Sequence, residues 1–122
     1  MLVVDDEAEV RAYLRRILTK AGHEVWEAPD GTEALRLLET RAFGLVITDA
    51  YMAEVDGMEL LVRIQQRGLH MPVLMISGGG YMARQDVLEM GKSCGAVATL
   101  EKPFSPEQLR ATIEPLLKAS AT

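Results

Sequence analysis

The chain has 122 residues, of which 48% are hydrophobic and 25% charged, and its formal net charge at pH 7 is −5. This size and composition are typical of one globular domain with its own core, and no apolar run is long enough to span a bilayer. The acidic balance argues against direct nucleic-acid binding, because phosphate backbones need a basic surface. The single cysteine, Cys94, rules out an internal disulfide and a thiolate zinc cluster. We therefore expect one cytoplasmic domain over residues 1–122, with no second domain in this chain and no direct contact to nucleic acid or membrane.

Strand-like and helix-like patterns alternate along the chain. Apolar residues 2–4 run into Asp5 and Asp6, and apolar side chains then recur at helical spacing from Glu7 to Ala21-Gly22, where glycine favours a helix end. The patterns that follow predict, in chain order, a strand at 23–28, a helix at 30–43, a strand at 44–49, a helix at 57–68, a strand at 71–77, a helix at about 82–92, a strand at 96–102 and a last helix from Pro106.

Two of the predicted helices begin with capping signals. Asp30 and Glu33 stand at the spacing of a capping box, in which an N-cap side chain and a residue three positions later bond to each other's backbone. The last helix has Ser105 as N-cap, Pro106 at the first helical position and Gln108 at the third. Both signals predict where a helix starts.

The alternation of strands and helices predicts an α/β fold. Successive β–α units are joined by right-handed crossovers, which give a parallel sheet with helices on both faces. The apolar, β-branched run at 44–49 is typical of a strand that is covered on both sides. The sequence has no internal repeat and no low-complexity tract, so we expect a single domain.

Four of the predicted strands end in polar side chains: Asp5 and Asp6, Asp49, Ser77, and Lys102. The carboxyl ends of parallel strands lie at one edge of the sheet, where open α/β sheets bind ligands, so we expect these side chains to converge. Three carboxylates without a neighbouring histidine form an oxygen site suited to Mg²⁺. The ammonium and hydroxyl groups can bind a phosphoryl group, with one carboxylate as its acceptor.

Four motifs at these positions, in this order, resemble the receiver domain of two-component response regulators over residues 2–118. They are the pair Asp5-Asp6, "VITDAYMAEVDG" (46–57), "VLMISG" (73–78) and "LEKPF" (100–104). The resemblance implies a flavodoxin-like (βα)5 domain with the strand order 2-1-3-4-5. It also implies a signalling phosphoprotein that catalyses only its own phosphorylation and dephosphorylation.

The resemblance assigns a role to each polar residue at the strand ends. Asp49 is the expected phosphoacceptor. The expected Mg²⁺ ligands are Asp5, Asp6, Asp49 and the backbone carbonyl of Tyr51. Lys102 and Ser77 are expected to bind the phosphoryl oxygens, and Ser77 is also expected to act as a switch together with Thr99, which stands where the family has an aromatic residue. The family further implies a cis peptide bond between Lys102 and Pro103.

The resemblance also implies the partners of the domain. The phosphoryl donor would be a sensor histidine kinase or a histidine phosphotransfer protein. The face formed by the fourth helix, fifth strand and fifth helix would carry the signal to a target or join two copies of the chain. The sequence leaves open whether the domain acts alone or belongs to a longer protein.

Three other functions fit the sequence less well. An aspartyl-phosphate hydrolase of another fold family needs a second aspartate two residues after the nucleophile, where this chain has Tyr51. A receiver-like domain used only as an interaction surface would not need the full set of polar strand-end residues. A mononucleotide-binding flavodoxin-like protein would bring its phosphate against repelling carboxylates.

Overall fold

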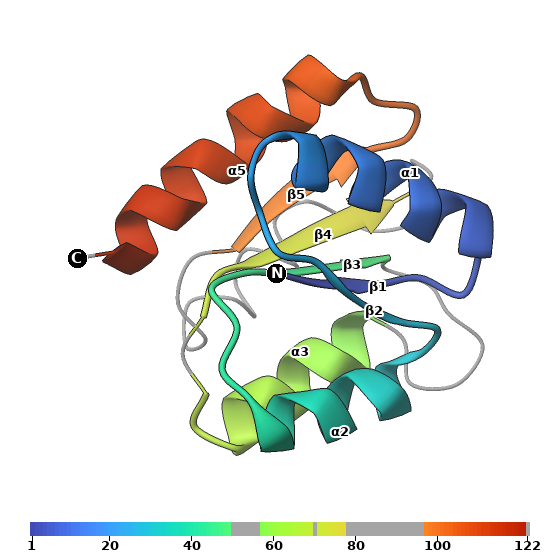
Figure 1. Cartoon of the computed structure of the whole chain (residues 1–122). Helices are drawn as coiled ribbons and strands as arrows, with labels where there is room; N and C mark the ends of the chain where they lie inside the picture. The colour runs from blue at the N-terminus through green and yellow to red at the C-terminus, as the bar shows by residue number, and fades with distance from the viewer. Residues whose placement is uncertain (50–56, 70, 78–96, 122) are drawn as a thin grey trace.

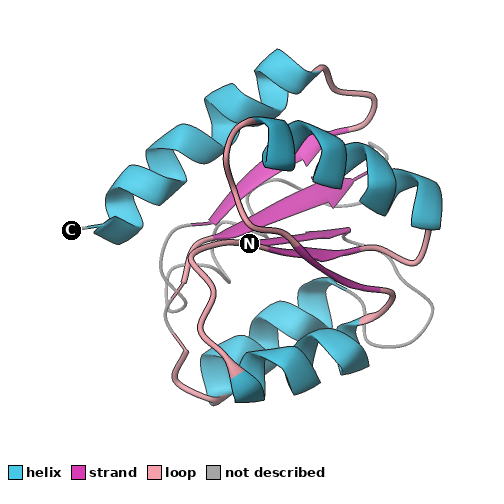
Figure 2. Cartoon of the chain, viewed as in Figure 1, coloured by secondary structure: helices cyan, strands magenta, loops and turns pink. Residues whose placement is uncertain are grey.

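A computed structural model of the chain describes residues 1–49, 57–69, 71–77 and 97–121. Figure 1 shows the arrangement of the helices and strands, and Figure 2 shows the same view coloured by secondary structure. In chain order the elements are β1 (Leu2–Val4), α1 (Ala8–Lys20), β2 (Trp26–Ala28), α2 (Gly31–Thr40), β3 (Val46–Asp49), α3 (Gly57–Gln66), β4 (Val73–Ser77), β5 (Val97–Glu101) and α5 (Pro106–Ala121).

The strands form one sheet of five in the order β2-β1-β3-β4-β5. Every neighbouring pair is parallel. This confirms the α/β fold and the flavodoxin-like strand order, in which the chain reverses direction across the sheet after β2. Four helices are described, and the helix predicted at about 82–92 lies outside the described residues.

The helices cover the two faces of the sheet as two separate layers. α1 and α5 lie over one face, and α2 and α3 lie over the other (Figure 1). Successive side chains of a strand point to opposite faces, so Leu2 and Val4 join the core under α2 and α3 whereas Val3 joins the core under α1 and α5. All three residues of β1 are buried, which explains its unbroken apolar sequence.

Two element boundaries differ from the sequence prediction by three residues, and the other differences are of one or two residues. The strand predicted at 23–28 is shorter, because the backbone at 21–23 still belongs to the end of α1: His23 N donates to Leu18 O at 3.0 Å, around Gly22 with a φ of 94°. The helix predicted at 30–43 ends at Thr40. Arg41 is already extended, and this turn of the chain lets Phe43 pack in the core under α2 and α3.

The capping signals were correct at both predicted helix starts. Glu33 N donates to the Asp30 carboxylate at 2.8 Å. At α5 the bonds are reciprocal: Gln108 N donates to Ser105 Oγ at 3.1 Å, and Ser105 N donates to Gln108 Oε1 at 2.8 Å. These bonds satisfy backbone groups that have no partner inside the helix, and they fix where α5 begins.

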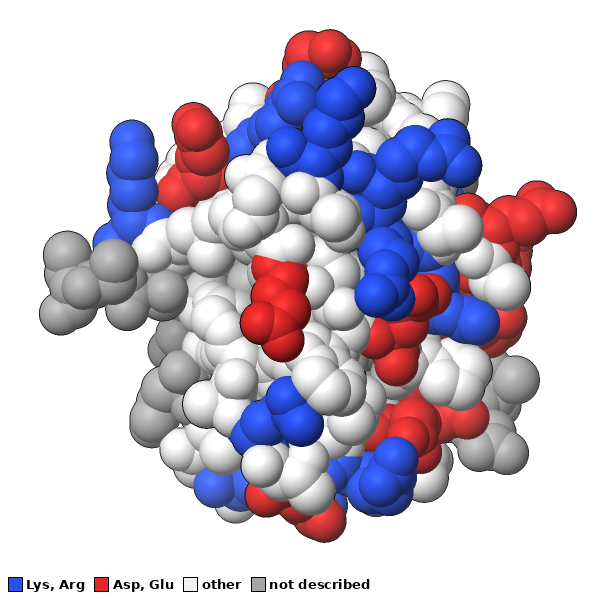
Figure 3. All heavy atoms as spheres, viewed as in Figure 1, with Lys and Arg blue, Asp and Glu red and all other residues white. Residues whose placement is uncertain are grey.

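The surface carries charges of both signs. On the face seen in Figure 3, basic and acidic side chains lie next to one another and do not form a field of one sign. Several charged side chains of the described residues are paired, as Arg67, which follows α3, is with Glu39 of α2 at 2.8 Å. In the part of the chain that the structure describes, no helix is long and apolar enough to cross a membrane.

Candidate functional site

The strand register brings the acidic residues of β1 and β3 to the same edge of the sheet. Val4 is paired with Thr48, so Asp5 and Asp49 both follow this pair at the carboxyl ends of their strands. Asp49 is in turn paired with Ile76, one residue before Ser77 at the end of β4. The convergence predicted from the sequence therefore follows from the parallel pairing of β1, β3 and β4.

Asp5, Asp6 and Asp49 form one acidic cluster. Each offers a carboxylate oxygen, and these three atoms lie within 4.8 Å of one another. Asp5 and Asp49 are buried, with exposures of 1% and 8%, whereas Asp6 is exposed. The cluster thus has two carboxylates on its protein side and one on its solvent side.

Lys102 brings a positive charge to this cluster from the residue after β5. Its Nζ lies 3.6 Å from Asp5 Oδ2 and 3.7 Å from Asp49 Oδ1. The side chain remains 26% exposed, so its ammonium group lies between the buried carboxylates and solvent. The Lys102–Pro103 peptide bond is cis, as the resemblance implied.

Burial raises the pKa of the Asp5 carboxyl group above its usual value. Desolvation is the largest cause, because a buried carboxylate loses the water that stabilises its charge. A hydrogen bond from Glu7 N, at 2.9 Å, and the Lys102 ammonium oppose this rise, while the charges of Asp49 and Asp6 add to it. Burial, more than repulsion from the neighbouring carboxylates, therefore raises the pKa of Asp5.

The chemistry of the cluster fits a magnesium ion. Its ligand atoms are carboxylate oxygens, which Mg²⁺ prefers, and the exposed side of Asp6 leaves room for the waters that this ion retains. A divalent cation would also neutralise the excess negative charge around Asp5. The residues that would hold it are Asp5, Asp6 and Asp49.

The remaining predicted site residues are placed only in part. Ser77 ends β4, where it is paired with Glu101 next to Lys102, but its side chain lies outside the described part of the chain. Thr99 is half-buried in β5 and is paired with Met75. Tyr51, whose carbonyl was the fourth predicted Mg²⁺ ligand, also lies outside the described residues.

Two residues of α1 support this edge of the sheet and were not predicted as part of the site. Tyr13 Oη donates to Phe104 O at 3.1 Å, and its ring lies 5.9 Å from that of Phe104, so α1 holds the segment that follows Lys102. Arg11 Nη1 donates to the carbonyl of Asp5 at 2.7 Å. A basic residue on the helix that follows the acidic pair was the available signal, but helical spacing alone does not show what it contacts.

The comparisons with known proteins agree with this geometry. A family model described as "Response regulator receiver domain" matches residues 1–114. The alkaline phosphatase synthesis transcriptional regulatory protein PhoP of Bacillus subtilis (strain 168) is 33% identical over 122 residues, which cover 98% of this chain and 49% of that protein. The response regulator MprA of Mycolicibacterium vanbaalenii is 38% identical over 120 residues, covering 97% and 50%. The chain thus spans about half the length of these curated relatives.

Solved structures give the same result. The receiver domain of NtrX from Brucella abortus has a TM-score of 0.83 at 35% identity, with 96% of this chain and 97% of that chain covered. The chemotaxis protein CheY4 of Vibrio cholerae has a TM-score of 0.80 at 34% identity, with 94% and 95% covered. On the family match, the relatives and the shared fold, this chain belongs to the receiver domain family of two-component response regulators.

Proposed function

We propose that the chain accepts a phosphoryl group from a phosphohistidine donor onto Asp49, in a Mg²⁺-dependent reaction, and then signals to a partner. The observation that carries this proposal is the placement of Asp49. It is a buried carboxylate that lies 3.7 Å from the Lys102 ammonium and within 4.8 Å of two further carboxylates. A nucleophile, a cation for the phosphoryl oxygens and a set of metal ligands therefore meet at one sheet edge.

In the proposed reaction a carboxylate oxygen of Asp49 attacks the phosphorus of the donor. An oxygen–phosphorus bond forms, the phosphorus–nitrogen bond breaks, and its electron pair stays on the departing imidazole. Lys102 pairs with the phosphoryl oxygens, and Asp5 and Asp6 hold the metal beside Asp49. The bound Mg²⁺ supplies the charge neutralisation that lets three carboxylates and a phosphoryl group occupy one site.

We propose a phosphoryl donor and an output for the chain as well. A sensor histidine kinase or a histidine phosphotransfer protein in the cytoplasm is the donor, and the chain catalyses no turnover beyond its own phosphorylation and dephosphorylation. Ser77 and Thr99 act as the switch, and the face made by β5, α5 and the helix predicted at about 82–92 contacts a target or a second copy. Because PhoP is named a transcriptional regulatory protein, a transcriptional output through a partner region is proposed here too, without direct nucleic-acid binding by this domain.

Labelling with a small phosphodonor tests the proposal. The chain is incubated with phosphoramidate, which carries the same phosphorus–nitrogen bond, with Mg²⁺ or with a chelator, and its intact mass is measured. We expect one phosphoryl group per chain with Mg²⁺ and none in its absence. Asp49→Asn should take up none, whereas Asp30→Asn, which changes an aspartate outside the site, should label as the wild type does. Stoichiometric labelling of Asp49→Asn would refute the assignment.

A further inference from the structure

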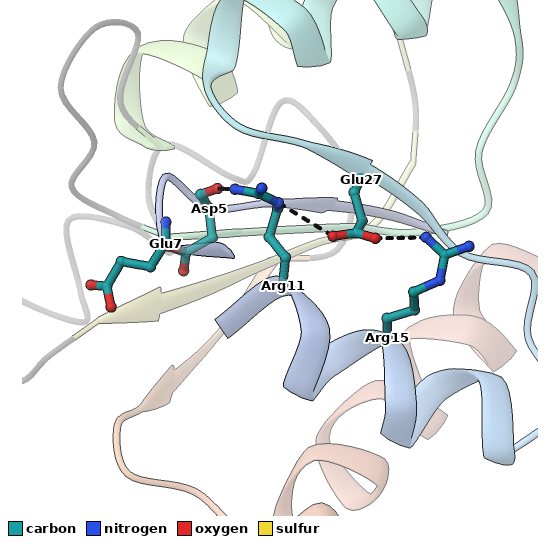
Figure 4. Close-up of polar contacts among 5 residues, drawn as sticks. All are labelled: Asp5, Glu7, Arg11, Arg15 and Glu27. Carbon is teal, nitrogen blue, oxygen red and sulfur yellow. Dashed lines mark hydrogen bonds and ion pairs between the residues drawn. The ribbon is translucent and has the colours of Figure 1, made fainter. Parts of the chain in front are cut away.

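Arg11 connects the candidate site to the edge strand β2. It lies on α1, and its guanidinium group extends toward the carboxyl end of β1 (Figure 4). Nη1 donates to the backbone carbonyl of Asp5 at 2.7 Å, and Nε donates to Glu27 Oε1 at 3.3 Å. One planar group thus bridges the main chain of the acidic pair and a side chain of β2.

Glu27 is itself held from a second direction. Its other oxygen, Oε2, accepts a hydrogen bond from Arg15 Nη1 at 2.6 Å. Arg11 and Arg15 stand one turn apart on α1 and both point toward the same carboxylate (Figure 4). The exposed fractions of the side chains are 18% for Arg11, 29% for Glu27 and 53% for Arg15, so the end of this row nearest the site is the most shielded from water.

Hydrogen bonds hold the backbone and the side chain of Asp5 in place. Its backbone N–H donates to Ala28 O at 3.2 Å, which extends the pairing of β1 with β2 by one residue. Its carboxylate accepts the bond from Glu7 N at 2.9 Å. Its carbonyl accepts the bond from Arg11. Every polar group of Asp5 therefore has a protein partner, and the carbonyl that Arg11 contacts belongs to the peptide unit that joins Asp5 to Asp6.

We propose that Arg11, held by Glu27 and Arg15, is a positioning residue that orients the Asp5–Asp6 peptide and thereby the two carboxylates for Mg²⁺. The inference rests on the proposed function, since it assigns a support to the same metal site. A guanidinium group suits this role because its rigid fork can donate to two acceptors at once. Groups that orient metal ligands from behind change metal affinity about 10–100-fold when they are removed.

The sign of the effect separates positioning from simple electrostatics. Arg11 carries a positive charge close to the site, so if it acted only through its charge, its removal would strengthen the binding of a cation. If Arg11 positions the acidic pair, its removal weakens Mg²⁺ binding despite the lost repulsion. A loss of Mg²⁺ affinity in a correctly folded variant therefore has no long-range electrostatic explanation.

The test measures Mg²⁺ affinity by calorimetric titration of the whole chain, together with circular dichroism to confirm that each variant is folded. We expect Arg11→Ala to bind Mg²⁺ about tenfold more weakly than the wild type. Arg11→Lys keeps the charge but lacks the two separate nitrogens that donate to Asp5 O and Glu27 Oε1, and we expect its Mg²⁺ affinity to fall between those of the wild type and Arg11→Ala. Arg16→Ala is the matched control, because Arg16 is an exposed arginine on the same helix; its affinity should be unchanged or slightly higher.

Glu27→Gln provides a second route if Arg11→Ala does not fold. It keeps the size of the side chain but removes the charge that holds Arg11. Because the loss of a negative charge by itself also weakens cation binding, we expect Glu27→Gln to lose more Mg²⁺ affinity than Glu9→Gln, which removes the same charge from an exposed position on α1; an equal loss in the two variants would refute the positioning role. If Arg11 acts through Glu27, the double variant should lose little more than Arg11→Ala alone. Independent, additive losses would overturn the role given to Glu27.

The results also distinguish this inference from the proposed function. If the wild type neither binds Mg²⁺ nor takes up a phosphoryl group on Asp49, the proposed function is refuted and the role of Arg11 with it. If the wild type does both, and the folded Arg11→Ala variant binds Mg²⁺ as well as or better than the wild type, only the positioning role is refuted.

Discussion

Replacing Asp5 by asparagine is expected to stabilise the metal-free protein at neutral pH. Asp5 is 1% exposed, its carboxylate lies within 4.8 Å of those of Asp6 and Asp49, and the opposing Lys102 ammonium is 3.6 Å away. Asparagine has nearly the same shape and keeps an oxygen that can accept the bond from Glu7 N. The substitution therefore removes the charge and retains the local hydrogen bond.

The size of the expected stabilisation follows from the distances between Asp5 and the neighbouring charges. At an effective dielectric constant of about 20, each repulsion across at most 4.8 Å is at least about 3.5 kcal/mol and the attraction across 3.6 Å is about 4.6 kcal/mol. Two repulsions thus exceed one attraction by about 2 kcal/mol, and solvent around the exposed Asp6 lowers this excess. We expect Asp5→Asn to gain about 1–2 kcal/mol, or roughly 4–8 °C in Tm for a domain of this size.

The stability gained by Asp5→Asn should decrease as the pH falls. The pKa of Asp5 is raised in the folded state, so the folded protein binds this proton more tightly than the unfolded chain does. The stabilisation that comes from this tighter proton binding is fully present below the ordinary aspartate pKa of 3.8. It is lost as the pH rises through the raised pKa of Asp5 in the folded protein. The advantage of Asp5→Asn is therefore greatest at neutral pH and disappears in acid.

Urea unfolding in the presence of a chelator, followed from pH 7 toward pH 4, measures this difference. Glu9→Gln is the control, since it neutralises an exposed acid on α1 and should change stability by less than about 0.5 kcal/mol. Adding Mg²⁺ should stabilise the wild type more than Asp5→Asn and narrow the gap. The reasoning is refuted if Asp5→Asn is less stable than the wild type at pH 7, or if its advantage does not shrink in acid.

Four further predictions concern the site and the fold. Lys102→Gln removes the ammonium that contacts Asp5 and Asp49, so it should bind Mg²⁺ more tightly in titration yet take up less phosphoryl group by mass. Asp6→Ala should weaken Mg²⁺ binding and abolish labelling; an unchanged affinity would contradict its role as a ligand. Ser105→Ala loses the bond that caps α5 and should cost about 1 kcal/mol in urea unfolding, with labelling preserved. Leu109→Ala creates a cavity at a fully buried position under α5 and should cost about 2–5 kcal/mol, against little change for the exposed Arg110→Ala.

Much of the site could be predicted because its geometry follows from strand direction. Once β1, β3, β4 and β5 run parallel in one sheet, the residues at their carboxyl ends have to lie along one edge. Asp5, Asp49 and Lys102 do meet there. The helix starts could be predicted equally well, because the hydrogen bonds between Ser105 and Gln108 join residues only three positions apart.

The ends of helices and strands were harder to predict where tertiary packing competes with the local conformational preference of the sequence. The residues up to Phe43 continue an apolar pattern that suits a helix, yet Phe43 is buried in the core only because the chain leaves the helix at Arg41. The sequence pattern places His23 in a strand, whereas its N–H closes the turn at the end of α1. In both cases a local pattern was compatible with two conformations, and contacts with the rest of the fold selected one.

The sequence by itself determined the parallel α/β order, the helix caps and the group of polar residues at the strand ends, because these depend on local spacing and chain direction. Only the tertiary structure decided how that group is supported and charged. Arg11 reaches Glu27, 16 residues away, because α1 packs across β1 and the edge strand β2. The raised pKa of Asp5 likewise comes from its burial in the folded sheet, since desolvation depends on the atoms that surround a carboxylate and not on its neighbours in the chain.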